Sequence, residues 1–157
     1  METTPIDIAR VKGEILQAAL REQERIIADF QKRIEDTMAS VTKVQPESFE
    51  GNHRTCKPEV LAEIDILKNE LEVATRELEQ MKKIDCATPH AKVEYGSVVE
   101  TDKGNYFISA GFKDFKVTDK TYCALSVFSP TYIAMKDKRA GDSFSARNVQ
   151  YTIRSIF

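Results

Sequence analysis

A heptad repeat between Val60 and Met81 constrains the fold of this chain more than any other feature of its sequence. Apolar residues recur at alternating spacings of four and three, at Val60, Ile64, Leu67, Leu71, Ala74, Leu78 and Met81. Charged and amide side chains fill the positions between them. Such a seam predicts a long helix that packs against another helix, because one helix alone leaves the seam exposed to water.

A second, looser apolar stripe precedes the heptad repeat and can supply the partner helix. Its members are Ile8, Val11, Ile15, Ala19, Ile26, Phe30, Ile34 and Val41. Glu22 and Gln23 interrupt this stripe. Asp7 would lie in the first turn, where a carboxylate favours the helix dipole. We therefore expect a first helix that starts at about residues 3–5 and runs to about Val41.

The stretch between the two stripes is typical of a turn. Pro46 and Gly51 both discourage helix there. Pro58 has a fixed φ that suits the first position of a second helix, which we expect to extend to about Lys83. We predict an antiparallel coiled-coil hairpin over residues 1–84, with its tip loop at about residues 42–58. A hairpin formed within one chain predicts a monomer.

The pattern changes after a short linker at residues 85–92. Helical periodicity stops, and Val, Tyr, Phe, Ile and Thr become frequent, as is typical of strands. We expect strands at residues 93–101, 105–110, 115–117, 122–128, 143–146 and 149–156, and a short helix or turn from Ser129 to about Lys138. The predicted fold class is α+β: the hairpin is followed, over residues 93–157, by a small, mostly antiparallel sheet domain with one short helix.

Composition narrows the classes of protein to consider. The net charge of the 157 residues is −2, which argues against free nucleic acid as the main partner. No run of 18 apolar residues occurs, and METTPIDIAR at the N-terminus lacks a signal pattern, so we expect a cytoplasmic protein that does not bind membranes. The three cysteines are expected to be free thiols.

Two His and Cys pairs invite a zinc interpretation. His53 and Cys56 precede the second helix, and Cys86 and His90 follow it. A helix of this length separates the two pairs by about 45 Å, and two ligands at each end are too few for a structural zinc site. We therefore expect no stably bound metal.

Three segments of the C-terminal half resemble a known family. They are VEYGSVV at residues 93–99, SPTYIAMKDKRAGD at residues 129–142, and the terminal VQYTIRSI at residues 149–156. In this order they resemble the C-terminal domain of the Gre family of bacterial transcript-cleavage and elongation factors. That domain has an FKBP-like fold, and the family also has an N-terminal antiparallel coiled coil.

The middle segment keeps most of the family pattern S-P-x-x-x-A-L-x-G-K-x-x-G-D. The matching residues are Ser129, Pro130, Ala134, Lys138, Gly141 and Asp142. Three positions depart from the pattern: Asp137 stands where glycine is usual, Lys136 where an apolar residue is common, and Tyr132 where glycine is frequent. The resemblance implies that residues 129–142 dock on the polymerase.

The resemblance also implies a mechanism. The C-terminal domain would dock at the mouth of the secondary channel of RNA polymerase, and the coiled coil would enter the channel. Two acidic tip residues, spaced D-x-x-E in the family, would help to hold a second Mg²⁺ in the polymerase active site, where the metal activates water to cut backtracked RNA. The chain itself would be no enzyme. It would share Mg²⁺ only within the complex and would act on RNA indirectly.

The tip can be aligned with that acid pair in two ways. In one alignment Glu47 and Glu50 are the acids. In the other, Asn52 and Thr55 occupy the two positions, and the metal-presenting chemistry is absent. The tip carries Lys43, Arg54 and Lys57 against Glu47 and Glu50, whereas a tip that presents a cation is expected to be net negative. A cleavage-stimulating factor and a channel-binding regulator without cleavage activity therefore both stay open.

Two functions of other classes also stay open. An FKBP-like domain on a helical arm could be a prolyl isomerase or chaperone module, which would need an apolar peptide-binding groove. The heptad repeat could instead serve self-association of a structural coiled coil. Turnover of a proline peptide would identify the first, and the molar mass in solution would identify the second.

Overall fold

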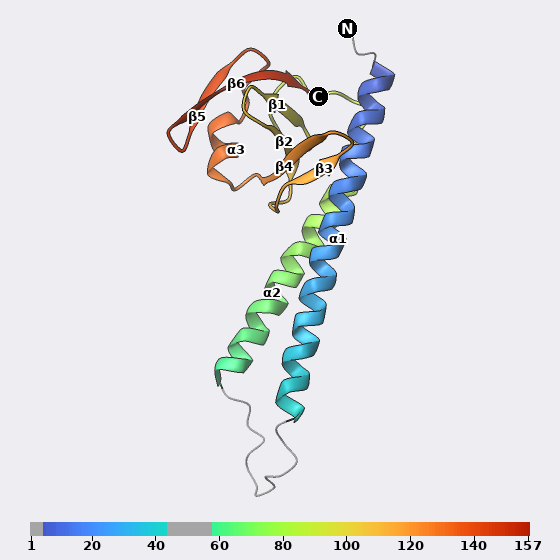
Figure 1. Cartoon of the computed structure of the whole chain (residues 1–157), viewed down its shortest axis with the longest axis vertical. Helices are drawn as coiled ribbons and strands as arrows, with labels where there is room; N and C mark the ends of the chain where they lie inside the picture. The colour runs from blue at the N-terminus through green and yellow to red at the C-terminus, as the bar shows by residue number, and fades with distance from the viewer. Residues whose placement is uncertain (1–4, 44–57) are drawn as a thin grey trace, which may run out of the picture. The chain divides into compact units, whose positions relative to one another are not determined.

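The computed structural model describes residues 5–43 and 58–157 of the chain, and it has three helices and six strands there (Figure 1). The helices are α1 (Pro5–Lys43), α2 (Pro58–Met81) and α3 (Pro130–Met135). The strands are β1 (Val98–Thr101), β2 (Asn105–Ser109), β3 (Phe115–Val117), β4 (Lys120–Ser126), β5 (Ser143–Ala146) and β6 (Val149–Ile156). The predicted α+β class, a helical hairpin followed by a sheet with one short helix, is confirmed.

The strand that was predicted to begin at residue 93 begins instead at Val98. Gly96 has φ of +87°, a left-handed conformation that interrupts an extended strand and suits glycine. Val93 pairs elsewhere, because its N–H donates to the carbonyl of Lys138 at 2.9 Å. The predicted bounds of β3, β5 and β6 agree with the structure.

The sheet has the strand order β3-β4-β2-β1-β6-β5 and is mixed rather than purely antiparallel. Strand β4 runs parallel to β2, with Asn105 opposite Tyr122 and Ser109 opposite Ser126. The remaining pairs are antiparallel. The predicted, mostly antiparallel sheet is therefore found, with one parallel pair. This pair arises because the second strand of the β3–β4 hairpin, and not the first, pairs with β2.

Contacts divide the chain into two compact units, and each is described here by itself. Unit 1 contains residues 1–23 and 77–157, and unit 2 contains residues 24–76. The predicted domain boundaries lie at residues 84/85 and 92/93. They concern segments that fold independently, and a division by contacts does not test independent folding. The boundaries therefore stay a prediction.

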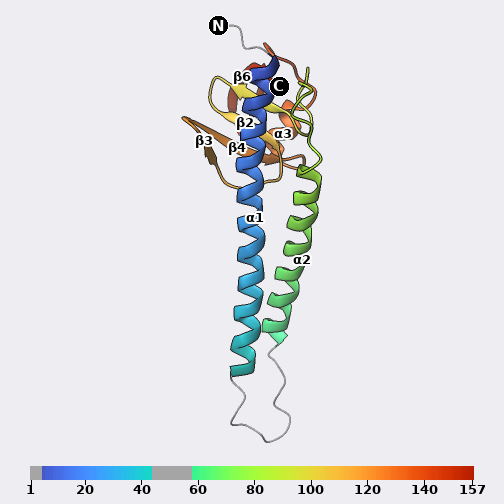
Figure 2. The same ribbon diagram turned by 90° about the vertical axis from the view of Figure 1, so that its right-hand side faces the viewer.

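In unit 1, the sheet is covered on one face by the first turns of α1 and on the other by α3 (Figures 1 and 2). The α1 side of the core contains Ile15, Leu16, Ala18, Ala19, Met81, Val98, Phe107, Ala110, Phe115, Tyr122 and Ala124. The α3 side contains Val93, Val99, Ile108, Tyr132, Met135, Phe144, Ala146 and Ile153. Burying apolar side chains on both faces is what stabilises a sheet of this size.

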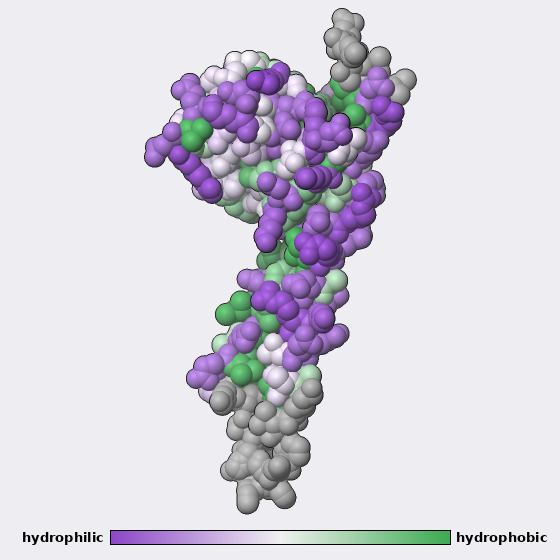
Figure 3. Space-filling model, viewed as in Figure 1, coloured by the Kyte–Doolittle hydropathy of each residue, from purple (hydrophilic) through white to green (hydrophobic). Residues whose placement is uncertain are grey.

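In unit 2, α1 and α2 lie side by side and antiparallel, as the predicted hairpin requires (Figure 2). Ile34 of α1 and Ile64, Leu67 and Ala74 of α2 are buried. The heptad seam therefore faces inward. Apolar residues also reach the surface on the α2 side, where Leu61, Ile66 and Val73 are each about half exposed (Figure 3).

The interruption of the first apolar stripe has a structural cause. Gln23 is buried, and its Nε2 donates to a carboxylate oxygen of Glu77 at 3.3 Å. Burial raises the pKa of Glu77, while the bond from Gln23 acts in the opposite direction. Apolar residues of α1 before Gln23 belong to the core under the sheet, and those after it belong to unit 2. Helix α1 thus has two apolar faces, one before and one after Gln23, and Gln23 lies at the boundary between them.

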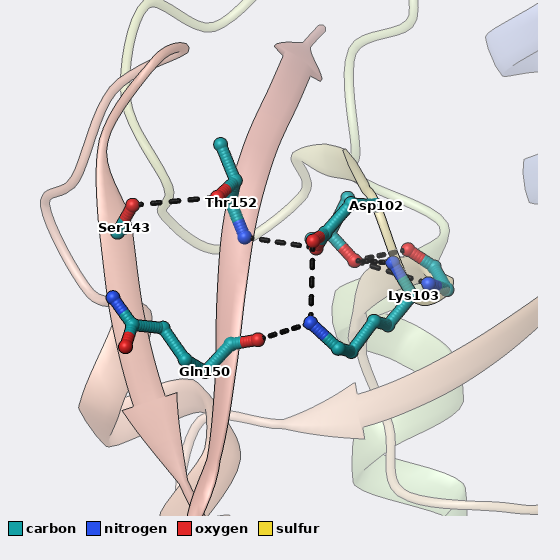
Figure 4. Close-up of polar contacts among 7 residues, drawn as sticks. Asp102, Lys103, Ser143, Gln150 and Thr152 are labelled. Carbon is teal, nitrogen blue, oxygen red and sulfur yellow. Dashed lines mark hydrogen bonds and ion pairs between the residues drawn. The ribbon is translucent and has the colours of Figure 1, made fainter.

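Asp102 links the β1–β2 turn to β6 (Figure 4). Its Oδ1 accepts from the N–H of Thr152 at 2.9 Å, and its own N–H donates to the carbonyl of Thr152 at 3.0 Å. Lys103 lies 3.2 Å from the second carboxylate oxygen and also donates to the carbonyl of Gln150. The N–H of Thr152 is the main cause that holds the pKa of Asp102 below its ordinary value, and Lys103 adds to it.

Candidate protein-docking site

The four tip residues on which the metal-presenting mechanism depends lie outside the described residues. Glu47, Glu50, Asn52 and Thr55 all fall within residues 44–57. Helix α1 ends at Lys43 and α2 begins at Pro58, so these residues occupy the predicted connection between the two helices. Both alignments of the acid pair stay predictions.

The residues of the zinc interpretation are only partly described. His53 and Cys56 lie outside the described residues. Cys86 has a free thiol whose pKa is raised by burial, and Nδ1 of His90 lies 2.6 Å from a carboxylate oxygen of Glu94. Within residues 5–43 and 58–157, no three His, Cys, Asp or Glu side chains group closely enough to hold a metal ion. In the same ranges no helix is long and apolar enough to cross a membrane.

Residues 129–142, which we call the docking segment, begin with a capped helix. Ser129 is the N-cap of α3, and its Oγ accepts from the N–H of Tyr132 at 3.1 Å. Pro130 follows at the first helical position, where its missing N–H costs nothing. Tyr132 and Met135 are buried against the sheet, and Ala134 packs at the edge of the same core. The first half of the docking segment is thereby fixed to the sheet.

The second half of the docking segment is a turn that returns the chain to β5. Asp137 has φ of +64°, in the left-handed region that follows many helices and that glycine enters freely. Glycine would adopt this conformation without strain, whereas an L side chain adopts it rarely. Backbone bonds of 3.0 and 2.9 Å join Asp137 and Lys138 to Val93. The carboxylate of Asp137 also pairs with Lys92 at 3.3 Å.

Gly141 and Asp142 complete this turn. Gly141 has φ of +93°, and its N–H donates to the carbonyl of Ile153 at 2.8 Å. The carboxylate of Asp142 accepts from the N–H of Arg139 at 2.8 Å. Together with Ser129 and Pro130, these motif residues therefore build the segment itself, and their polar groups are engaged inside the chain.

Two large apolar side chains of this region point outward instead. Phe128, directly before the docking segment, is 86% exposed, and Ile133 on α3 is 64% exposed. Sequence reasoning missed Phe128, because it assigned this residue to a strand that in fact ends at Ser126. The helical period gave a signal for Ile133, since Tyr132 and Met135 share the inward face and leave Ile133 on the other. Lys136 and Arg139 are exposed nearby in the sequence.

Two hollows on the described residues differ from an apolar peptide groove. One, of about 530 Å³, lies between α1 and β3 and is lined largely by charged and polar residues. The other, of about 430 Å³, follows residues 80–96 and includes Lys83, Asp85, His90 and Glu94 in its lining. Both have charged side chains in their linings, whereas the isomerase interpretation needs a predominantly apolar groove.

No protein-family model matches this chain, and no curated protein matches it. Among solved structures, the chain is similar to the crystal structure of GreA factor homolog 1 (Gfh1) of Thermus thermophilus, with 15% sequence identity and a TM-score of 0.33 over 89% of this chain and 95% of that chain. A structure of the transcription factor Gfh1 aligns with 14% identity and a TM-score of 0.34 over 88% of this chain and 93% of that chain. Likeness at these values carries no argument about function, and membership of the Gre family stays a proposal.

Proposed function

We propose that this protein is a cytoplasmic transcription elongation factor that binds RNA polymerase and acts through its secondary channel. The observation that carries the proposal is the exposure of Phe128 and Ile133 on and beside the segment that resembles the Gre docking motif. Isolated apolar residues at a surface are common, but a few large side chains that become buried on binding supply most of the affinity of an interface, and Phe128 and Ile133 are large enough to act in this way. The chain supplies no catalytic residue of its own in this proposal.

The second element of the proposal is the hairpin tip. Glu47 and Glu50 would lend carboxylate oxygens to a Mg²⁺ ion in the polymerase active site, since Mg²⁺ prefers such ligands. If Asn52 and Thr55 take those positions instead, the same docking would give a channel-binding regulator without cleavage activity. Docking and cleavage are therefore separate claims, and each needs its own experiment.

Docking is tested by the affinity of the full chain for the host RNA polymerase. We expect Phe128→Ser/Ile133→Ser to weaken binding about tenfold or more, because both side chains would lose apolar burial in the complex. Val149→Ser is the matched control, since Val149 is also a partly exposed apolar residue, but on β6. Equal binding by the double variant and the unmodified chain would refute docking through this surface.

Cleavage is tested with backtracked elongation complexes of the same polymerase. Faster RNA cleavage that Glu47→Ala/Glu50→Ala abolishes, and that Asn52→Ala/Thr55→Ala retains, would establish a cleavage factor with its acids at the first two positions. Binding without faster cleavage, together with displacement of another channel-binding factor, would establish a regulator. Absence of polymerase binding would remove the family-based function.

Self-association is a second candidate, and the surface of α2 favours it. Leu61, Ile66 and Val73 are each about half exposed in unit 2 (Figure 3). Apolar side chains on an exposed helix can form the seam of an intermolecular helix bundle. We nevertheless expect a monomer, because Ile64, Leu67 and Ala74 of the heptad seam are already buried within unit 2. A concentration-independent molar mass of 17.8 kDa would support this expectation.

A further inference from the structure

A groove of about 530 Å³ lies between α1 and β3 within unit 1. Its α1 wall is one face of the helix, because Arg10, Gly13, Gln17 and Arg21 recur at spacings of three and four. Its other wall is Lys116 and the residues that follow it on β3 and the next turn. The two views in Figures 1 and 2 both place β3 beside α1. The volume is within the range of ligand-binding pockets.

Gly13 leaves open space in the wall of this groove. A glycine within a helix costs about 1 kcal/mol relative to alanine. A Cβ atom added at Gly13 would meet no other atom within 4 Å, and φ there is not in the left-handed region. Neither packing nor backbone conformation therefore calls for glycine, whereas any larger side chain would project into the groove. Gly13 keeps this part of the groove open to a molecule that approaches the helix closely.

The charge of the groove favours an anionic occupant. Arg10, Arg21 and Lys116 line it against a single carboxylate, that of Glu14. Arg10 forms a long ion pair of 3.9 Å with Asp7. Arg21 and Lys116 have no ion-pair partner in the part of the chain that the structure describes. Three cations against one carboxylate attract an acidic ligand by charge complementarity.

Strand β3 is an edge strand, and this favours a peptide over a nucleic acid. It stands at one end of the strand order and pairs with β4 alone. In an antiparallel pair, alternate residues direct their N–H and C=O groups away from the partner strand, so an edge strand can pair with another extended chain. A phosphate backbone does not offer the matching pattern of amide groups.

We propose that this groove binds an extended acidic segment of a protein partner, which adds a strand to the free edge of β3. Main-chain hydrogen bonds to β3 would supply affinity, and Arg10, Arg21 and Lys116 would select acidic side chains. The proposal does not depend on RNA polymerase as the partner. Its experiment contains no polymerase, so it can fail while the proposed function stands.

The experiment titrates the isotope-labelled full chain with a short peptide of alternating Glu and Val, followed by nuclear magnetic resonance. We expect the amide signals of Gly13 and of residues 116–118 to shift, and the affinity to fall as salt is added. A peptide in which Lys replaces Glu is the ligand control, and a single-stranded oligonucleotide tests nucleic acid. No shift at about 1 mM acidic peptide, shifts that map elsewhere, or tighter binding of the oligonucleotide would each overturn the proposal.

Variants of the groove make the test specific. Arg21→Glu/Lys116→Glu is expected to weaken binding of the acidic peptide about tenfold or more, because two attractive charges become repulsive. Gly13→Leu is expected to block the groove, whereas Gly13→Ala, its matched control, adds a Cβ into open space and is expected to keep most of the affinity. Equal affinity of Gly13→Leu and Gly13→Ala would contradict a ligand that occupies this groove.

Discussion

Replacing Lys12 by methionine is expected to stabilise unit 1 by about 2 kcal/mol. Lys12 lies on α1 with 0% of its surface exposed, and its Nζ has no hydrogen-bond partner among the described residues. A buried donor without a partner costs about 1–3 kcal/mol, and more when it is charged. Methionine has a similar length and volume without the ammonium group, so it should fill the same space.

The charges near Lys12 reduce the cost of burying its ammonium group, so the expected gain is below the top of this range. Burial lowers the pKa of Lys12, while Cys86, Asp85 and Glu94 act in the opposite direction. The Cys86 thiol stays neutral near pH 7, because burial raises its pKa as well. Attraction by the two carboxylates therefore offsets part of the desolvation cost, and about 2 kcal/mol remains as the expected gain.

Tyrosine fluorescence during urea unfolding measures this gain in stability within unit 1. The chain has no Trp, and its five tyrosines all lie in unit 1, at Tyr95, Tyr106, Tyr122, Tyr132 and Tyr151. The signal therefore reports the unfolding of the unit that contains Lys12. A gain of this size should also raise the melting temperature by about 4–8 °C in a chain of this length. Lys113→Met, at an exposed lysine of the same unit, is the control and should change little.

The pH dependence of the gain identifies its cause. The folded pKa of Lys12 lies below the ordinary value of 10.5, so the unfolded chain binds more protons between these two values. The stability of the unmodified chain should therefore rise, relative to Lys12→Met, as the pH rises through that window. The advantage of the variant should be largest below the window and smaller at pH 10.5. A destabilised variant, or an advantage independent of pH, would refute an unpaired buried ammonium.

Three further predictions concern single positions, each followed by urea unfolding. Gly141→Ala should lower the free energy of unfolding by about 1–2 kcal/mol, because φ is +93° and the added Cβ makes no contact that would offset the strain. Gly13→Ala, in a helix interior, should raise the free energy of unfolding by about 1 kcal/mol. Changes of the same sign in the two variants would contradict this reasoning. Ser129→Ala should cost about 1 kcal/mol through loss of the α3 N-cap, and Ser129→Thr should restore most of it. Asp102→Asn should destabilise the chain at neutral pH, because the folded pKa of Asp102 is lowered by the N–H of Thr152. The difference in stability between the variant and the unmodified chain should vanish as the pH falls below 3.8 and through the folded pKa. A difference that stays constant down to about pH 2 would contradict this prediction.

Periodicity predicted the helices and most strands because local pattern decides them. The heptad residues Ile64, Leu67 and Ala74 are buried as expected. The pairing of β2 with β4 could not be predicted, because β3 and β4 form a hairpin in either arrangement, and only packing decides which of its strands meets β2. Lys12 gave no signal either, since a lysine beside an apolar stripe is ordinarily solvated.

Helix α1 shows why the first apolar stripe was harder to interpret than the heptad. A stripe with one partner keeps one period, as α2 does. Before Gln23, α1 packs on a sheet, and this face buries adjacent residues such as Ile15 and Leu16 together with Ala18 and Ala19. A sheet covers a wider arc of a helix than a second helix does, so burial there includes positions that a two-helix seam would expose.

In the docking segment, the residues that match the motif determine the local fold, and other residues are exposed for the proposed binding. Ser129 and Asp142 satisfy backbone N–H groups, and Gly141 supplies a left-handed turn, so a chain that keeps these letters keeps the shape of the segment. The exposed Phe128 and Ile133 lie at positions that the motif does not specify. Ser129→Ala should therefore lower stability. Phe128→Ser/Ile133→Ser should lower affinity for RNA polymerase, the proposed partner, and leave stability within about 0.5 kcal/mol. If the serine variants instead unfold the segment, Phe128 and Ile133 act in folding, and the segment has no separate binding face.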